Sequence, residues 1–246
     1  MMPLVSIVIP SFNSSTLIEN CLKSVLKTDY PNFEVIVVDD CSTDGSLKIA
    51  ESFLNDDRLK LIRKDNRSGP SATRNVGIDA AKGEYVAFLE TDMEVESDWL
   101  KEIIRVLESD RSIGAAQSKA LDMKNRNRIV ATGIQIIPHI AWVVNIRSQA
   151  VEEVSIGAVG SVVRHEVLEK IGGFDEKLVH NIDDIDWGWR IWLGGYRIIS
   201  VSTSITYHWA SKPPRTRERM TPKLESEIHF NKVPRIFIKN YETSNL

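Results

Sequence analysis

The sequence predicts an α/β domain with a mostly parallel central sheet and helices on both faces. Up to about residue 120, short runs rich in Val, Ile and Leu alternate with longer amphipathic stretches, a pattern typical of βα units that feed a parallel sheet. The runs are apolar at nearly every position, as strands covered on both faces require. Beyond that point the order changes to strands that follow one another directly, which predicts a smaller β region beside the main sheet.

Five runs are predicted to be strands of the main sheet, because each is short, rich in β-branched residues and bounded by turn residues. They are Leu4–Pro10, Phe33–Asp39, Leu59–Lys64, Glu84–Leu89 and Ile113–Ala120. Gly77, Gly83 and the pair Asp44 and Gly45 are interpreted as breaks between elements.

The helices are predicted from apolar residues that recur on one face. The first is expected over Ser15–Lys27, and Ser42 with Thr43 provides N-cap chemistry for the next one. Helical periodicity returns at His165–Ile171 and at Ile182–Leu193.

The smaller β region is predicted from two runs, Arg128–Ile137 and Trp142–Arg147, which look like paired strands about Pro138. A further apolar strand is expected over Ser155–Val163. We expect this half of the chain to determine acceptor specificity. The basic, proline-bearing segment Lys212–Arg219 is predicted to be a loop able to close over a ligand.

Composition limits the class of protein. A chain of 246 residues with 42% hydrophobic content can bury a single core. A formal net charge of -3 gives no global positive field, so nucleic acid is not an expected partner. Cys21 and Cys41 form no metal-binding or disulfide pattern, and the opening MMPLVSIVIPSF lacks a basic region and a cleavage site. A cytoplasmic protein is the expectation.

Acidic residues follow two of the predicted strands, where ligands of parallel sheets bind. Asp39 and Asp40 end the second run, and one of them could accept a hydrogen bond from a base or a ribose; alternatively, Asp40 caps the turn. Glu90 and Asp92 flank Thr91 after the fourth run, a spacing suited to a hard cation beside a diphosphate. The alternative for this triplet is a solvated turn.

A third acidic group lies at the start of the last predicted helix, in NIDDIDWGWR. Its members are Asp183, Asp184 and Asp186, and they precede Trp187, Trp189 and Trp192. The positive end of a helix dipole tolerates such charge, which is the simpler interpretation. Three acids beside aromatic residues favour a sugar-binding platform that carries a catalytic base.

Six motifs in order give the chain a resemblance to the inverting GT-A glycosyltransferases of the family-2 type. They are VSIVIPSFN, VIVVDDCSTDG, GPSATRNVGI, GEYVAFLETD, GGFDE and DIDWGWR. The resemblance covers residues 4 to about 209. It implies the GT-A fold and transfer of a sugar from a nucleotide diphosphate sugar to an acceptor hydroxyl, with inversion. Residues 1–210 would form the catalytic domain, with a nucleotide-sugar-binding half (1–120) and an acceptor-side half (121–210), followed by a basic loop and helical tail (211–246).

The resemblance also implies roles for individual residues of the donor site. Pro10, Phe12 and Asp39 match positions that line the base and ribose pocket, with Asp40 beside them. Arg74 and Asn75 match a pair behind the donor, where Arg74 would contact the nucleotide or its phosphates.

The reaction centre is implied in the same way. Asp92 matches the metal-binding aspartate of the family's DxD, with Glu90 and Thr91 in the same donor-binding turn, and His208 matches a histidine near the metal. Mn²⁺ or Mg²⁺ is the expected cofactor. The remaining expected residues are Asp184 as catalytic base with Asp183 as the alternative, Trp187 and Trp189 as acceptor contacts, and Arg215 or Arg217 as helpers at the leaving group.

Two departures from the family pattern leave alternatives open. Glu90 replaces the usual first aspartate of the DxD, and Met93 stands where an acid is common. A catalytically silent nucleotide-sugar-binding protein is therefore one alternative, and a nucleotidyltransferase on a similar sheet is another. An NAD oxidoreductase is disfavoured because no GxGxxG follows the first strand.

The expected partners are a nucleotide diphosphate sugar and a saccharide or lipid-linked acceptor. Similar proteins commonly continue toward membrane-associated helices after a segment related to FIKNYETSNL, where this chain stops. We therefore expect a truncated catalytic domain from a protein that is cytoplasmic or lies at the cytoplasmic face of a membrane.

Overall fold

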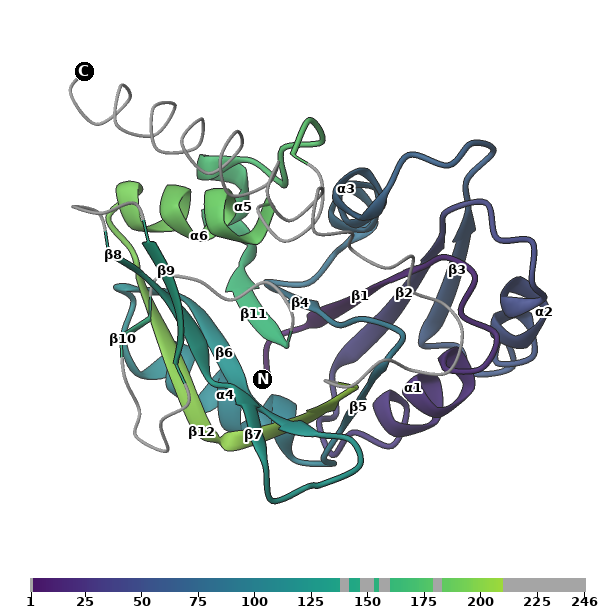
Figure 1. The fold of residues 1–246 in the computed structure, drawn as a ribbon, viewed down its shortest axis with the longest axis horizontal. Helices are drawn as coiled ribbons and strands as arrows, with labels where there is room; N and C mark the ends of the chain where they lie inside the picture. Colours follow the sequence, from purple (N-terminus) through teal and green to yellow (C-terminus); the bar gives the residue numbers. More distant parts are fainter. Residues whose placement is uncertain (1, 138–141, 147–152, 155–159, 179–182, 210–246) are drawn as a thin grey trace.

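The computed structural model describes residues 2–137, 142–146, 153–154, 160–178 and 183–209. Within these ranges the chain forms one large sheet and one two-stranded sheet (Figure 1). The strands of the large sheet are β1 (Val5–Ser11), β2 (Phe33–Asp39), β3 (Leu59–Arg63), β4 (Tyr85–Phe88), β5 (Met93–Val95), β6 (Ile113–Asp122), β7 (Ile129–Ala131), β10 (Glu153–Val154), β11 (Ser161–Arg164) and β12 (Arg197–His208). The smaller sheet pairs β8 (Gly133–Ile137) with β9 (Trp142–Ile146).

The large sheet is mixed, and the predicted parallel arrangement holds for β1 to β4 and for β6 with β12. Its order is β10-β12-β6-β11-β4-β1-β2-β3, with β5 on β12 and β7 on β6. β1 pairs in parallel with β2 and β4, and β2 pairs in parallel with β3. The first four predicted strands match β1 to β4 to within one residue at either end. Their carboxyl ends therefore share one edge of the sheet.

Strand β11 reverses direction inside this sheet and so determines which later strand ends at the same edge. β11 is antiparallel to both β4 and β6, and β12 is parallel to β6. Two reversals restore the original direction, so β6 and β12 run the same way as β1 to β4. The end of β12, at His208, consequently lies on the edge where β4 ends.

Six helices are present in the described ranges, and they cover both faces of the sheet. They are α1 (Ile18–Val25), α2 (Ser46–Glu51), α3 (Pro70–Ala80), α4 (Trp99–Ser109), α5 (His165–Ile171) and α6 (Asp183–Leu193). Side chains of a strand point alternately to either face. Ile7 and Ile9 of β1 accordingly join a core with α1, α2 and α4, whereas Val8 joins a second core with α5 and α6.

Helix α3 packs directly against β1 through Gly77. A Cβ atom at this position would lie 2.3 Å from Cγ1 of Val8, so only glycine permits the observed approach. The prediction that Gly77 breaks the chain between elements is wrong, because the residue lies inside α3. Its role is close packing of the helix on the sheet.

The start of α2 also differs from the prediction. Ser42 and Thr43 do not cap this helix, which begins three residues after Thr43 at Ser46. The N-cap is Gly45, and Asp44 before it forms a local turn in which its Oδ1 accepts hydrogen bonds from the backbone N–H and the hydroxyl of Ser46 at 3.0 and 2.6 Å. The side chain of Ser42 is used to join the loops after β1 and β2.

The second half agrees in part with the predicted β region. The run Arg128–Ile137 divides into β7 and β8, because β7 pairs with β6 of the large sheet whereas β8 pairs with β9. The β8–β9 pairing confirms the predicted pair. The turn at Pro138, residues 155–159 of the next predicted strand and the predicted basic loop with Arg215 and Arg217 lie outside the described residues.

The helices predicted at His165–Ile171 and Ile182–Leu193 correspond to α5 and α6. Among the described residues, no helix has both the length and the apolar character needed to cross a bilayer.

Candidate active site

The loops after β1 and β2 are tied together and form one side of the site. Asn13 and Cys41, which follow these two strands, both have positive φ, at 46° and 64°. The backbone N–H of Asn13 donates to Oγ of Ser42 at 3.0 Å, and its Oδ1 accepts from the backbone N–H of Thr43 at 2.9 Å. These bonds hold both loops in tight, left-handed turns beside Asp39.

Asp39 lies at the end of β2 and is buried, with 1% of its surface exposed. Its Oδ2 accepts a hydrogen bond from the backbone N–H of Ser42 at 3.0 Å. Its Oδ1 has no hydrogen-bond partner among the described residues. A buried carboxylate oxygen without a partner is costly, so this atom is suited to accept a hydrogen bond from a ligand.

Pro10 and Phe12 lie at the same end of β1, and both are half-buried. The guanidinium of Arg67 lies 4.1 Å from the centre of the Phe12 ring, a cation–π contact. Their assignment to the base and ribose pocket stays a prediction.

Asp40 is used differently from Asp39. Its Oδ1 accepts hydrogen bonds from Lys64 Nζ at 2.7 Å and from the backbone N–H of Ser68, and its Oδ2 accepts from the backbone N–H of Gly69. Burial alone would raise the pKa of Asp40, but these bonds outweigh it and the pKa is lowered. Asp40 therefore holds the loop that leads into α3, and its assignment to the nucleotide stays a prediction.

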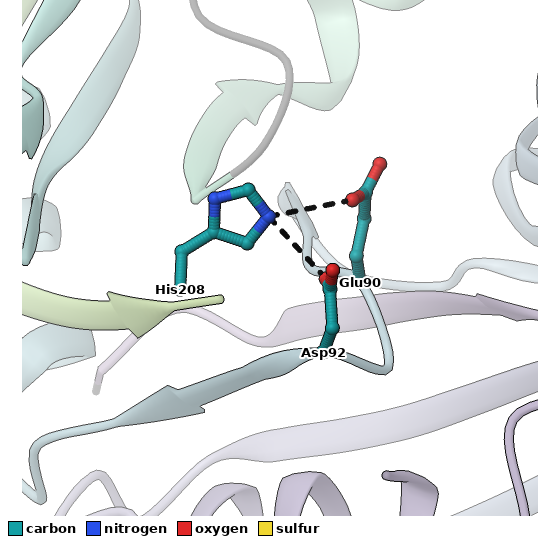
Figure 2. Close-up of side chains that lie close together, drawn as sticks. All are labelled: Glu90, Asp92 and His208. Atoms are coloured by element: carbon teal, nitrogen blue, oxygen red, sulfur yellow. Dashed lines mark ion pairs between the residues drawn. The ribbon is translucent and has the colours of Figure 1, made fainter. Parts of the chain in front are cut away.

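Glu90, Asp92 and His208 come together at the shared edge of the sheet (Figure 2). His208 ends β12, which pairs with β5, and this pairing places its ring beside the turn that contains both acids. His208 Nε2 lies 3.4 Å from Oδ1 of Asp92 and 3.9 Å from Oε2 of Glu90. One donor atom from each residue lies within 4.8 Å of the others.

This donor set fits a divalent cation. Carboxylate oxygens are the ligands that Mg²⁺ and Mn²⁺ prefer, and an imidazole nitrogen is acceptable to Mn²⁺. The turn that contains Glu90 and Asp92 is bound to the chain on both sides of His208. Before His208, β12 pairs with β5, and after it the backbone N–H of Trp209 donates to the carbonyl of Asp92 at 3.3 Å. Glu90, expected among the donor-binding residues, joins the two residues predicted as ligands, and Thr91 lies between the two acids.

Met93 does not face this cluster. Its side chain is 1% exposed and belongs to the core under α1 and α4. The absence of an acid at Met93 therefore leaves the cluster of three side chains intact.

Arg74 of α3 connects the cluster to α6. Its Nη2 lies 3.0 Å from Oε1 of Glu90, and its Nη1 lies 2.8 Å from Oδ2 of Asp183. The guanidinium also lies 5.2 Å from the centre of the Phe174 ring. In this structure Arg74 therefore contacts two carboxylates, and its contact with the nucleotide or its phosphates stays a prediction.

Asn75, the neighbour of Arg74, is occupied by the loop before α6. Its Nδ2 donates to the carbonyl of Phe174 and to Oε1 of Glu176, both at 2.9 Å, and its Oδ1 accepts from the backbone N–H of Phe174 at 2.8 Å. These bonds use both amide protons and the amide oxygen. Asn75 thus fixes Phe174 beneath Arg74, and its assignment to the nucleotide site stays a prediction.

The three acids of α6 have different partners. Asp183 accepts hydrogen bonds from Arg74 and, at 3.0 Å, from the hydroxyl of Ser71. Asp186 pairs with Arg190 at 2.8 Å on the next turn. The carboxylate of Asp184 accepts from the backbone N–H of Ile185 at 2.8 Å and has no arginine or lysine partner among the described residues.

The pKa of Asp184 differs from that of an ordinary aspartate. Burial raises it to about 6, the negative charge of Asp183 adds to the rise, and Arg74 opposes it. A carboxylate with a pKa just below neutral can accept a proton and release it again near pH 7. Asp184 is therefore the member of the group best suited to act as a base, whereas Asp183 is held by Arg74.

The tryptophans of α6 are not arranged as predicted. Trp187 is fully buried, with its ring stacked on Phe174 at 5.1 Å and edge-on to Phe88 at 5.6 Å. A sugar platform needs an open ring face, so the prediction that Trp187 contacts an acceptor is wrong. Trp189 is 5% exposed and its acceptor role stays a prediction, while Trp192 is 48% exposed.

Comparison with protein families gives a match over most of the chain. The model described as glycosyl transferase family 2 matches residues 6–172, which is more than half of the 246 residues.

Two curated relatives are similar over less than half of the chain. The putative teichuronic acid biosynthesis glycosyltransferase TuaG of Bacillus subtilis is 40% identical over 100 residues, which cover 40% of this chain and 40% of TuaG. The poly(ribitol-phosphate) beta-N-acetylglucosaminyltransferase TarS of Staphylococcus aureus is 38% identical over 110 residues, covering 44% of this chain and 19% of TarS. The chain thus matches less than half the length of either relative.

Solved structures extend the similarity to the fold as a whole. The structure of S. aureus TarS 1–349 in complex with UDP-GlcNAc superposes with a TM-score of 0.73 at 25% identity, covering 98% of this chain and 67% of that one. The mannosyltransferase PcManGT of Pyrobaculum calidifontis, in complex with GDP-Man and Mn²⁺, gives a TM-score of 0.68 at 21% identity, with 98% and 74% covered. The fold is that of the GT-A glycosyltransferases.

Proposed function

The chain belongs to glycosyl transferase family 2, and on that premise we propose that it transfers a sugar from a nucleotide diphosphate sugar to an acceptor hydroxyl, with inversion and with a divalent cation. The observation that carries the proposal is the cluster of Glu90, Asp92 and His208, which Arg74 joins to the first turn of α6. A candidate cation-binding group and a base candidate are thus connected through one arginine, although they come from distant parts of the sequence.

The donor nucleotide is proposed to lie over the ends of β1 and β2. The buried Oδ1 of Asp39 supports this placement, because it can accept an N–H or O–H from a base or a ribose. TarS is known in complex with UDP-GlcNAc and PcManGT with GDP-Man, so uridine and guanosine diphosphate sugars are the first donors to test.

Glu90, Asp92 and His208 are proposed to hold Mn²⁺ or Mg²⁺. The cation would neutralise the charge that develops on the departing diphosphate. PcManGT and its Mn²⁺ support the choice of a divalent ion.

Asp184 is proposed to take the proton of the acceptor hydroxyl. Its pKa of about 6 leaves it mostly ionised at neutral pH while keeping it basic enough to accept a proton. Arg74 and Ser71 hold the adjacent Asp183 and so fix the start of α6. A single displacement, in which the acceptor oxygen attacks opposite the diphosphate, gives inversion and needs no covalent intermediate on the enzyme.

The acceptor is proposed to be a saccharide or a lipid-linked glycan. The names of TuaG and TarS refer to teichuronic acid and to poly(ribitol-phosphate), which are both polymers. A cytoplasmic location, at the cytoplasmic face of a membrane if the acceptor is lipid-linked, is part of the same proposal.

A catalytically silent nucleotide-sugar-binding protein is the second candidate, and Glu90 is the observation that favours it, since it replaces the usual aspartate. The two candidates differ in turnover. We expect the purified protein to be stabilised selectively by one nucleotide diphosphate sugar with Mn²⁺ in a thermal-shift screen of UDP-, GDP- and TDP-sugars. We expect it to release the nucleoside diphosphate when an acceptor is added.

Stabilisation without release, for every acceptor tried, would support the silent protein. Release of pyrophosphate from a nucleoside triphosphate and a sugar 1-phosphate, supplied in place of the nucleotide sugar, would support a nucleotidyltransferase. Comparison of the anomeric configuration of the product with that of the donor tests inversion.

A further inference from the structure

Glu90 contacts two groups at once, and each of its oxygens has a different neighbour. Oε2 faces His208 Nε2 at 3.9 Å in the cation cluster, and Oε1 faces Arg74 Nη2 at 3.0 Å. Figure 2 shows the side chain of Glu90 extended toward the ring of His208, beside Asp92. Glu90 is thus both part of the cluster and part of an ion pair that points away from it.

Arg74 is held in place on the other side of that ion pair. Its side chain is 6% exposed and pairs through Nη1 with Asp183, whose side chain is also 6% exposed. Phe174 lies under the guanidinium, and Asn75 fixes the backbone of Phe174 through both its N–H and its carbonyl. Because these contacts fix Arg74, the position of the Glu90 carboxylate determines that of the Asp183 carboxylate, and the reverse.

We propose that Glu90, Arg74 and Asp183 form a positioning bridge that fixes the cation cluster relative to the base on α6. Three separate elements meet in this bridge: the turn after β4, helix α3 and the first turn of α6. Asp184 follows Asp183 directly, so any shift of Asp183 moves the base. The inference rests on the proposed function, since it concerns how two parts of the proposed site are aligned.

The bridge also gives a reason for the glutamate at position 90. A glutamate has one methylene more than the usual aspartate, and here its two oxygens contact Arg74 and face His208. An aspartate at the same backbone position would keep a carboxylate for the cation but would draw it back from Arg74. The glutamate at position 90 is therefore explained by its ion pair with Arg74, which an aspartate would be too short to keep.

The test is to restore the usual residue with Glu90→Asp and, separately, to remove the planar fork with Arg74→Lys. Misalignment of reacting groups by about 1 Å costs roughly 100-fold in rate, so we expect each variant to lower kcat by about 10- to 100-fold. The affinity for Mn²⁺ alone, measured by electron paramagnetic resonance, should change much less in Glu90→Asp than kcat does. The double variant should be no slower than the slower single variant, because both break the same bridge.

Arg190→Lys provides the matched control. Arg190 is also an arginine paired with an acid of α6, at 2.8 Å from Asp186, but it does not contact Glu90 in the described structure. Its effect on kcat should multiply with that of Glu90→Asp. Circular dichroism and thermal melting of every variant report whether it folds.

The outcomes separate the bridge from the proposed function. Wild-type kcat in Glu90→Asp, or multiplying effects of Glu90→Asp and Arg74→Lys, would overturn the bridge while leaving the glycosyltransferase intact. A wild-type protein that neither binds Mn²⁺ nor transfers sugar would overturn both. Loss of kcat in both single variants, with no further loss in the double variant, supports the bridge.

Discussion

The three acids at the start of α6 show how a neighbour determines the use of a residue. Asp183 is paired with Arg74 and Asp186 with Arg190, so each of these buried carboxylates has an arginine partner. Asp184 lies between them without such a partner among the described residues, and its pKa is raised to about 6. Ionising the Asp184 carboxyl costs more free energy in the folded state than in the unfolded state. Replacing this carboxyl with a neutral group should therefore stabilise the protein.

Asp184→Asn should therefore separate stability from activity. Removing the acidic group should raise the free energy of unfolding at pH 7 by about 1–3 kcal/mol, because the folded state no longer holds an ionised group with a raised pKa. Transfer should fall by about 10²- to 10⁴-fold, the usual contribution of a general base. Denaturant unfolding and a transfer assay measure the two effects.

Asp186→Asn is the control on the same helical turn, and its expected change in the free energy of unfolding has the opposite sign. It leaves Arg190 without its carboxylate, so stability should fall by about 3 kcal/mol. Transfer by Asp184→Asn at the wild-type rate would exclude Asp184 as the base.

The pH dependence of the reaction follows from the same residue. Only the ionised form of Asp184 can take a proton, so kcat/KM should be constant above a pKa of about 6 and fall roughly tenfold per pH unit below it. The sign for stability is the reverse: because the folded pKa is raised, this group's destabilising contribution disappears as pH falls from about 6 toward 4. Assays between about pH 5 and pH 8 test the rate profile. Mn²⁺ binding is measured over the same range, so that a loss of the ion through protonation of its ligands can be separated from protonation of Asp184. A profile that is flat down to pH 5 would contradict the assignment.

The side chains whose sequence-based roles are changed by the structure are those with several chemically suitable partners. Asp39 and Asp40 are adjacent and identical, yet one keeps a buried oxygen open and the other binds Lys64 and a loop. Local pattern gives the residue type and the end of the strand but not the partner from a distant loop. The partners of Asn75 and Trp187 are distant in the same way, since Phe174 lies about a hundred residues after Asn75 and Phe88 about a hundred residues before Trp187.

At the scale of elements, the main feature is the close packing of α3 on β1, which places Arg74 between the cation cluster and α6. The approach depends on Gly77, whose missing side chain leaves room for Val8. A helix displaced outward would carry Arg74 away from Glu90 and Asp183.

Gly77→Ala should therefore destabilise the protein despite the higher helix propensity of alanine. The new Cβ would lie 2.3 Å from Cγ1 of Val8, and overpacking of this kind costs about 1–3 kcal/mol. Chemical denaturation measures the change. Asp79→Ala, an exposed position on the same helix, should change stability by less than about 0.5 kcal/mol; a similar loss in both variants would refute the packing argument.

Strands formed by a nearly continuous apolar run could be predicted from the sequence, because their composition alone marks them. β1 to β4 were found within one residue of their ends, and α5 and α6 followed from helical periodicity. β12 was not predicted, since its polar interior TSIT interrupts the apolar pattern where the register with β6 shifts. β5 was not predicted either, because three residues carry too little pattern.

At the scale of the whole molecule, the cation cluster joins the turn after β4 to the end of β12. A ligand that binds only the folded state stabilises it according to its concentration relative to Kd. Mn²⁺ at about 100 times its Kd should add about 2.7 kcal/mol to the free energy of unfolding, and a chelator should reverse the effect. His208→Ala should remove most of this gain, as thermal melting with and without Mn²⁺ would show; an equal gain in that variant would place the ion elsewhere.

The dependence of the cluster on β12 has a consequence for biosynthesis. Glu90 and Asp92 leave the ribosome long before His208, which is encoded nearly half the chain later. At about 5–20 residues per second, the delay is on the order of ten seconds. During that interval a nascent chain carries the two carboxylates without the imidazole, and the strand that bears the imidazole is still unmade. Capture of the ion would therefore be a late step, and translational pausing after β6 would lengthen the period in which the emerging polypeptide is metal-free.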